Sequence, residues 1–197
     1  MTDTSAQPSD AAPSHDQVIE ATRHWLTRAV IGLNLCPFAK SVHVKHQIRY
    51  AISDATATDQ ALADLETELL TLAQADPADV DTTLLILPHA LADFLDFNDC
   101  LHFADRLLKQ LRLEGTLQIA SFHPQYQFQG TAPDDIENYT NRAPYPILHL
   151  LREASIARAV DAFPDAADIY ERNQETLRRM GLAGWREWMS RTQPDSE

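Results

Sequence analysis

The residues best suited to chemistry lie in one stretch of the chain, from Ser121 to His149. This stretch contains two of the eight histidines, four of the eleven prolines and three of the five tyrosines. Before Pro144 it has too few apolar residues in sequence to predict a helix or a strand. A compact domain rarely keeps more than about 12–15 residues without regular structure unless they are functional or disordered. Because disordered segments are poor in aromatic residues, we predict an ordered loop that forms a site.

His123 is the first candidate for acid–base chemistry in this stretch. It ends a predicted strand and precedes Pro124, whose ring fixes its own φ angle and restricts the residue before it. An imidazole placed in a cleft can act as a general base, a general acid or a metal ligand. The alternative is a structural imidazole that hydrogen-bonds the loop. The same two interpretations apply to His149, in the segment PYPILHLLRE.

Three carboxylates stand within four positions of the same stretch, namely Asp134, Asp135 and Glu137. A pair of carboxylates can divide acid and base roles when their surroundings push their pKa values apart. Together with His123 and His149 they could also form a metal site of two histidines and one carboxylate. The simpler interpretation is that these acids stabilise the N-terminus of a short helical turn.

Arg142 is a cation in an acid-rich part of the chain, which makes it a suitable anchor for a substrate carboxylate or phosphate. It could equally pair with one of the three carboxylates and hold the loop closed. Tyr126, Asn141 and His149 are expected to complete the wall of the site. The leading hypothesis thus combines an acid–base histidine, assisting carboxylates and an arginine that orients an anionic substrate.

Cys36, in the segment LNLCPFAK, is a candidate nucleophile or haem ligand. A reactive thiol needs a neighbouring cation or a helix N-terminus to lower its pKa, and Lys40 is near in sequence. However, Cys36 precedes the first predicted strand, whereas His123 follows the third. A buried, inert cysteine is therefore the alternative.

Three segments, LNLCPFAK, QIASFHPQYQF and NYTNRAPYPILHLLRE, resemble an uncharacterised bacterial family of small proteins, a domain of unknown function. The resemblance spans most of residues 20–180 and brings no reaction with it. More weakly, an early Cys-Pro-Phe followed by Phe-His-Pro-x-x-x-Phe resembles the haem-dependent guanidine N-hydroxylases of bacteria. That second resemblance implies haem or another metal as cofactor, with His123, His149 or Cys36 as the candidate ligand.

The composition argues against several classes of partner. The chain carries 16 Lys and Arg against 29 Asp and Glu, a formal net charge of −13. Nucleic-acid binding and anionic membrane surfaces both need clustered cations, so we expect neither partner. No apolar run approaches the roughly 20 residues of a membrane helix, and the polar N-terminus lacks the pattern of a secretory signal. With two cysteines and no disulfide scaffold, a cytoplasmic location is expected.

The apolar pattern predicts one α/β domain over residues 14–190, between a flexible tail at 1–13 and a C-terminal tail at 191–197. Helices are predicted at about 14–32, 58–75, 92–113, 146–161 and 165–180, and strands at about 42–52, 82–88 and 116–122. This alternation indicates a small, mostly parallel sheet of three or more strands covered by helices, with further helices at the C-terminus. Ligands of such sheets bind beyond the carboxyl ends of the strands, where the 123–149 loop would lie.

Three hypotheses for function follow from these residues. The first is a cytosolic enzyme that acts on a polar or anionic small molecule through the 123–149 loop. The second is a haem- or iron-binding redox protein, and the third is a non-enzymatic binding or regulatory module. The residues leave the reaction, the substrate and the oligomeric state open.

Overall fold

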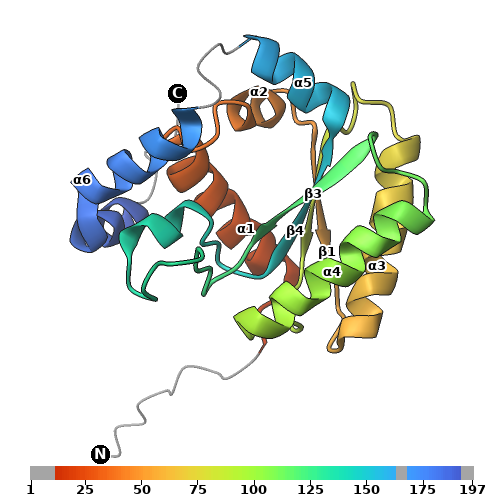
Figure 1. The fold of residues 1–197 in the computed structure, drawn as a ribbon, viewed down its shortest axis with the longest axis horizontal. Coiled ribbons are helices and arrows are strands. Elements are labelled where there is room, and N and C mark those ends of the chain that lie inside the picture. Colours follow the sequence, from red (N-terminus) through yellow and green to blue (C-terminus); the bar gives the residue numbers. More distant parts are fainter. Residues whose placement is uncertain (1–11, 163–167, 192–197) are drawn as a thin grey trace, which may run out of the picture.

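A computed structural model describes residues 12–162 and 168–191, which form helices around a mixed sheet (Figure 1). The strands of this sheet are β1 (Ile48–Ile52), β2 (Thr82–Ile86), β3 (Leu117–Phe122) and β4 (Ile147–Arg152). Their order is β1-β2-β4-β3. Strands β1 and β2 pair in parallel, whereas β4 pairs antiparallel with both β2 and β3. Three strands therefore share one direction, and β4 runs against them.

The helices confirm the predicted α/β class, including the helices at the C-terminus. In chain order they are α1 (His15–Trp25), the π-helix η1 (Leu26–Ile31), α2 (Ala39–Val44), α3 (Thr58–Gln74), α4 (Phe94–Gln110), the 3₁₀-helix η2 (Ile136–Thr140), α5 (Glu153–Ala162) and α6 (Ile169–Ser190). None of these described helices is long and apolar enough to cross a membrane.

Two clusters of buried apolar side chains cover the two faces of the sheet. Helices α3 and α4 pack on one face, where Leu65 and Phe97 meet Leu148 and other apolar residues of the strands. Helix α1, η1 and α6 pack on the other face, where Trp25 and Leu177 contribute to the second cluster. Figure 1 shows α3 and α4 on one side of the strands and α1 and α6 on the other. We call these the α3/α4 face and the α1/α6 face.

Two predicted elements are wrong in type. The predicted helix at 146–161 begins as strand β4, and α5 starts only at Glu153. Strand β4 lies between β2 and β3 and is mostly buried, so its apolar residues are nearly continuous and resemble the pattern of a helix. Likewise, the predicted strand at 42–52 contains the end of α2 followed by β1. Val44, which lies within the predicted strand, is 64% exposed at the end of α2.

The first helix begins as predicted. The Ser14 hydroxyl accepts a hydrogen bond from the N–H of Gln17, and the Gln17 side chain accepts one from the N–H of Ser14. This reciprocal pair is a capping box, which fits the predicted start at residue 14. The predicted helix at 165–180 stops where Gly181, with φ 65°, interrupts α6. Residues 1–11, 163–167 and 192–197, which include most of both predicted tails, lie outside the described residues.

Candidate functional site

The 123–146 loop connects two strands that are neighbours in the sheet. Phe122 at the end of β3 is paired with Ile147 at the start of β4, so the loop leaves and re-enters the sheet at one point. The backbone N–H of His123 donates to the carbonyl of Asn141 at 3.2 Å, which closes the base of the loop. Figure 1 shows the loop extending from the sheet towards α6.

A buried asparagine holds the interior of the loop. The Oδ1 atom of Asn138 accepts hydrogen bonds from the N–H of Phe128 at 3.0 Å and from the hydroxyl of Thr131 at 2.8 Å. Its Nδ2 group donates to the carbonyls of Ala132 at 2.8 Å and Pro133 at 3.4 Å. Because an amide side chain is fully paired in this way, Asn138 fixes several turns of chain at once. Nothing in the spacing of the sequence distinguished it from the other polar residues of the loop.

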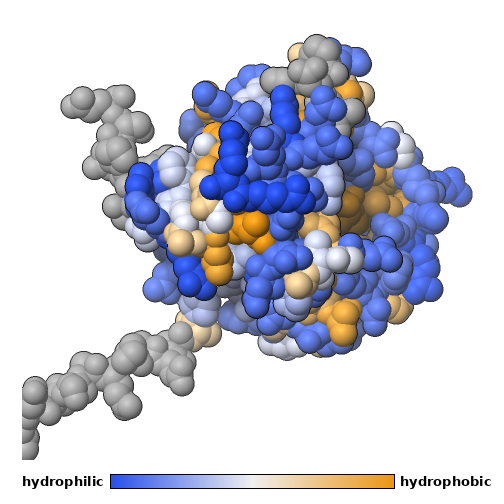
Figure 2. Space-filling view, turned by 60° about the vertical axis from the view of Figure 1, so that its left-hand side comes forward, coloured by the Kyte–Doolittle hydropathy of each residue, from blue (hydrophilic) through white to orange (hydrophobic). Residues whose placement is uncertain are grey.

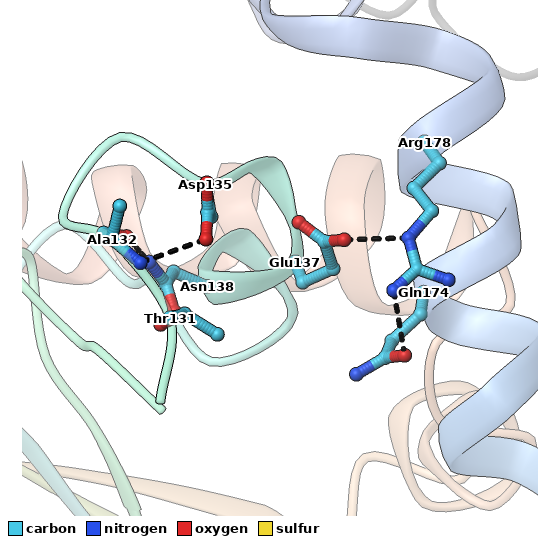
Figure 3. Close-up of polar contacts among 7 residues, drawn as sticks. All are labelled: Thr131, Ala132, Asp135, Glu137, Asn138, Gln174 and Arg178. Atoms are coloured by element: carbon cyan, nitrogen blue, oxygen red, sulfur yellow. Dashed lines mark hydrogen bonds and ion pairs between the residues drawn. The ribbon is translucent and has the colours of Figure 1, made fainter. Parts of the chain in front are cut away.

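The three predicted carboxylates face different surroundings, and two of them, Asp135 and Glu137, are drawn in Figure 3. Asp134 is exposed, whereas Asp135 accepts a hydrogen bond from the N–H of Ala132 at 2.7 Å. Glu137 forms an ion pair with Arg178 of α6, with 2.5 Å between Oε1 and Nε. Chiefly through this hydrogen bond, Arg178 lowers the pKa of Glu137 below its ordinary value. Glu137 therefore fastens the loop to α6, and no carboxylate pair forms among the three.

His123 is fully buried at the start of the loop. Its Nε2–H donates to the carbonyl of Leu91 at 3.0 Å, and its Nδ1 accepts from the N–H of Gln125 at 3.0 Å. The rings of Phe94 and Phe97 lie 5.3 and 5.1 Å from the imidazole. Burial lowers the pKa of His123 below its ordinary value of 6.5. Both ring nitrogens are thus engaged by backbone groups on the α3/α4 face.

Two further predicted loop residues pack beside this histidine. The ring of Tyr126 lies 5.2 Å from that of Phe94 and 5.0 Å from that of Phe128. Burial is the main cause that raises the pKa of Tyr126. The Nδ2 group of Asn141 donates to the carbonyl of Ser121 at 3.3 Å. In this structure, both side chains connect the loop to neighbouring parts of the chain.

His149 lies on the opposite face of the sheet, the α1/α6 face, where its ring is 6.0 Å from that of Phe122. The Thr82 hydroxyl donates to the carbonyl of Leu150 at 2.6 Å, so it can only accept from the Nε2–H of His149, at 2.8 Å. Burial lowers the pKa of His149 to about 4. The imidazole is consequently neutral at physiological pH.

Cys36 also packs on the α1/α6 face, so the sheet separates it from His123. Burial is the largest influence on its thiol and raises the pKa, against the opposing effect of the N–H groups of Phe38 and Ala39. A raised pKa reduces the thiolate fraction and hence the reactivity of a cysteine. Within residues 12–162 and 168–191, no group of three or more His, Cys, Asp or Glu could hold a metal ion.

The loop does contribute to an open cleft, which has a volume of about 740 Å³. Three segments that are far apart in sequence form its walls: α1, the 123–146 loop and the second half of α6. The lining residues are Gln17, Glu20, Ala21, His24, Trp25, Pro124, Tyr139, Arg142, Ala143, Pro144, Trp185 and Met189. Figure 2 shows the side of the molecule that carries the loop and α6, where apolar surface lies among hydrophilic residues.

Helix α1 and the π-helix η1 hold the second half of α6 in place beside the cleft. The indole N–H of Trp188 donates to the carbonyl of Arg28, and Nη2 of Arg28 donates to the carbonyl of Trp188, each at 2.8 Å. The Arg28 guanidinium also stacks 4.2 Å above the Trp188 ring. In addition, the imidazole of His24 bonds the carbonyl of Met189 at 2.8 Å. These contacts fix α6 after its break at Gly181.

Arg142 is the predicted anchor that the structure places in the cleft. Its Nε donates to the carbonyl of Tyr126 at 3.2 Å and its Nη2 to the carbonyl of Pro133 at 2.5 Å. The guanidinium lies 4.4 Å from the centre of the Tyr139 ring, and that ring meets Trp185 edge-on at 5.3 Å. Arg142 thus holds the loop through backbone carbonyls rather than through the three carboxylates, and it does so at the cleft wall.

The sequence prediction missed the contribution of α1 to the cleft. Gln17, Glu20 and His24 lie on the α1 side of the site, and Trp25 packs edge-on against Phe122 at 5.0 Å. Their spacing of three, four and one residues fits one side of a helix. Trp25 is followed at once by η1, and π-helical turns within α-helices occur frequently at functional sites. The helical spacing is visible in the sequence, whereas the π-helical turn is visible only in the structure.

A comparison with protein families assigns the chain to one of them. A family model described as a protein of unknown function, DUF1415, matches residues 17–187. The chain belongs to this family, and the match includes all three segments of the cleft. No curated protein and no solved structure matches the chain.

Proposed function

We propose that this protein binds a polar or anionic small molecule in the cleft between α1, the loop and α6, with Arg142 as the anchor for the anionic group. The observation that carries this proposal is the composition of the cleft wall. Three aromatic side chains, Trp25, Tyr139 and Trp185, line one space together with a guanidinium. Small-molecule sites typically combine apolar walls with a few polar groups that fix the orientation of the ligand.

The guanidinium of Arg142 retains donors for a ligand. The bonds to Tyr126 and Pro133 use one N–H each, and an arginine has five. The net charge of −13 repels anions at long range, so an anionic ligand needs both this local cation and apolar contact. The aromatic walls supply such contact best to a flat ring. The expected ligand is therefore a small molecule with a flat apolar body and a carboxylate or phosphate.

The position of this cleft also favours it, rather than the centre of the loop, as the binding site. A role for His123 in acid–base chemistry would require at least one of its backbone hydrogen bonds to open. Binding between α1, the loop and α6 needs no such rearrangement, because the lining residues already face a common space. Pro124 and Pro144 border this space just beyond the carboxyl end of β3, where ligands of α/β sheets commonly bind.

Ligand titration followed by tryptophan fluorescence and calorimetry tests the proposal. The probes are benzoate, indole-3-acetate and phenyl phosphate, with benzyl alcohol as the uncharged counterpart. We expect Arg142→Gln to weaken anion binding by about 10- to 100-fold, the value of one or two charge-assisted hydrogen bonds. Glutamine keeps a donor for the loop carbonyls, and binding of benzyl alcohol should change little.

Arg106→Gln is the matched control, since Arg106 is exposed on α4 and stacks on Phe103, away from the cleft. It should bind the anions as the wild type does. The proposal fails if no probe binds the wild-type protein at millimolar concentration. It also fails if Arg142→Gln and Arg106→Gln weaken anion binding equally.

A further inference from the structure

We propose that His24 is the acid–base residue of this cleft and that the site moves a proton on an aromatic 2-oxo acid. This inference rests on the proposed function, because it needs a ligand held at Arg142. It assigns to the protein an activity as well as a binding site.

The contact with α6 fixes which nitrogen of His24 carries the proton. The carbonyl of Met189 can only accept a hydrogen bond, so in the neutral imidazole the proton lies on Nε2, 2.8 Å away. Nδ1 then carries the lone pair. No described residue donates a hydrogen bond to Nδ1 in this structure. A histidine held through one nitrogen by a backbone carbonyl, with the other available, is the usual arrangement of a general base.

The two histidines singled out by the sequence differ from His24 on this point. Both nitrogens of His123 are paired with backbone groups, and its side chain is fully buried. His149 is bonded to Thr82 against the sheet, and burial lowers its pKa to about 4. His24 alone of these three lines the cleft. Its ring is therefore the one that a bound ligand would meet.

The residues around His24 supply the remaining requirements of proton transfer. Glu20, one helical turn before His24, lines the same cleft. Arg142 supplies a planar cation that can reach both the carboxylate and the adjacent oxygen of a 2-oxo acid. A fixed cation beside a developing oxyanion is the common means of stabilising an enolate. Trp25 and Trp185 provide apolar surface for the aromatic ring.

The chemical step balances without any further reactant. Nδ1 of His24 takes a proton from the carbon next to the ketone, and the electron pair of that C–H bond forms the C=C bond of the enolate. The former C=O pair moves to the oxygen, whose negative charge faces Arg142. The imidazolium then returns the proton to the oxygen, which yields the enol, or to the carbon, which restores the ketone. No oxidation or reduction occurs.

Hydrogen exchange on phenylpyruvate in deuterated buffer tests the inference. Proton NMR records the loss of the C3 protons, and tryptophan fluorescence records binding in the same samples. We expect the wild-type protein to accelerate exchange over buffer, and His24→Gln to reduce the acceleration by about a hundredfold or more. Glutamine can still donate to the carbonyl of Met189, so the contact with α6 and the affinity should be kept. His102→Gln, at an exposed position of α4, should behave as wild type.

The outcomes separate the two proposals. If phenylpyruvate binds but its exchange is not accelerated, or if His24→Gln exchanges at the wild-type rate, the inference is overturned and the binding function stands. If no probe binds, both are overturned. Nitrogen NMR of the wild-type histidines gives a test that needs no variant: the inference requires the Nε2–H tautomer at His24, and an Nδ1–H tautomer would contradict it.

Discussion

The two faces of the sheet are covered in different ways. On the α3/α4 face, two helices of 17 residues each bury leucines and Phe97 against the strands. On the α1/α6 face, a helix that turns into a π-helix, a long loop and an interrupted helix share the covering, and they leave the cleft. On the α3/α4 face there is a pocket of about 390 Å³ beside α3, against about 740 Å³ for the cleft on the α1/α6 face. The larger of these two spaces lies where the covering segments are irregular.

Polar groups also serve different purposes on the two faces. On the α3/α4 face, Arg152 is buried, and its guanidinium bonds the carbonyls of Leu72, Ala75 and Val80 at the end of α3. On the α1/α6 face, Arg142 is partly exposed at the cleft wall. Both arginines bond backbone carbonyls, but only the second faces a space that a ligand can enter. The predictions below test this contrast.

The largest effect on stability is expected from a residue on the α3/α4 face. Arg152→Met removes the donors to three carbonyls that are buried or partly buried, of which that of Leu72 also accepts from the N–H of Ala75 at 3.3 Å. This should lower the free energy of unfolding by about 2–4 kcal/mol, as measured by urea denaturation. Ligand binding to the folded fraction should be unchanged, because Arg152 is remote from the cleft lining. Arg106→Met, at an exposed arginine, is the control. If Arg152→Met lost less stability than Arg106→Met, the structural role of Arg152 would be contradicted.

The second prediction concerns His149, on the same strand but on the α1/α6 face. Its pKa is about 4 in the folded protein against an ordinary 6.5, so between these values the unfolded chain binds a proton that the folded chain does not. The contribution of His149 to the free energy of unfolding is therefore fully present above pH 6.5, and it falls towards pH 4 by up to about 3 kcal/mol. Urea denaturation across this pH range measures the loss. In His149→Gln, which keeps a donor for Thr82, the loss of stability between pH 6.5 and pH 4 should be smaller by this amount. If the free energy of unfolding changes with pH as it does in the wild type, the prediction is wrong.

The smallest effect is expected where the loop meets α6. Arg178 lowers the pKa of Glu137 in the folded protein. The ion pair therefore stabilises the protein fully above the ordinary pKa of a glutamate. This stabilisation is lost as the pH falls through the lowered pKa. Arg178 is 58% exposed, so solvent screening limits the gain to about 0.5 kcal/mol. Glu137→Gln should therefore be slightly less stable than wild type at pH 7, and the difference should shrink as the pH falls below the ordinary pKa of a glutamate. A difference that does not change with pH would indicate packing rather than charge.

The sequence predicted best where local signals and tertiary structure agree. The Ser14 capping box, the apolar stripes of α3 and α4, and the break at Gly181 are encoded within a few residues of each feature. The segment 147–152 is different, because Leu148 and Leu150 face one cluster while Ile147 faces the other. A strand with two buried faces loses the alternation that reveals a strand, and its position between β2 and β3 depends on residues far away in the chain.

The candidate site was predictable only in part, for a related reason. Arg142 stood out because a single cation in an acidic segment needs an explanation. His24 did not, because its contact with Met189 spans 165 positions in the sequence and exists only after α6 has packed on α1. The roles expected of His123 and the three carboxylates stay predictions. The hydrogen bonds of His123, Asp135 and Glu137 show which contacts would have to open for these three residues to act.

The pairing of β3 with β4 affects how far the loop between them can vary in length. Since the loop begins and ends at paired residues of two adjacent strands, its length is not constrained by any crossover. Doubling the length of a flexible loop costs only about 0.6 kcal/mol in closure entropy. Insertions, deletions or exchange of the whole segment would leave the order of the strands intact. Changes in the length of this loop can therefore alter the wall of the cleft without altering the order of the strands, provided that the contacts of His123 with Phe94 and Phe97 on the α3/α4 face are kept.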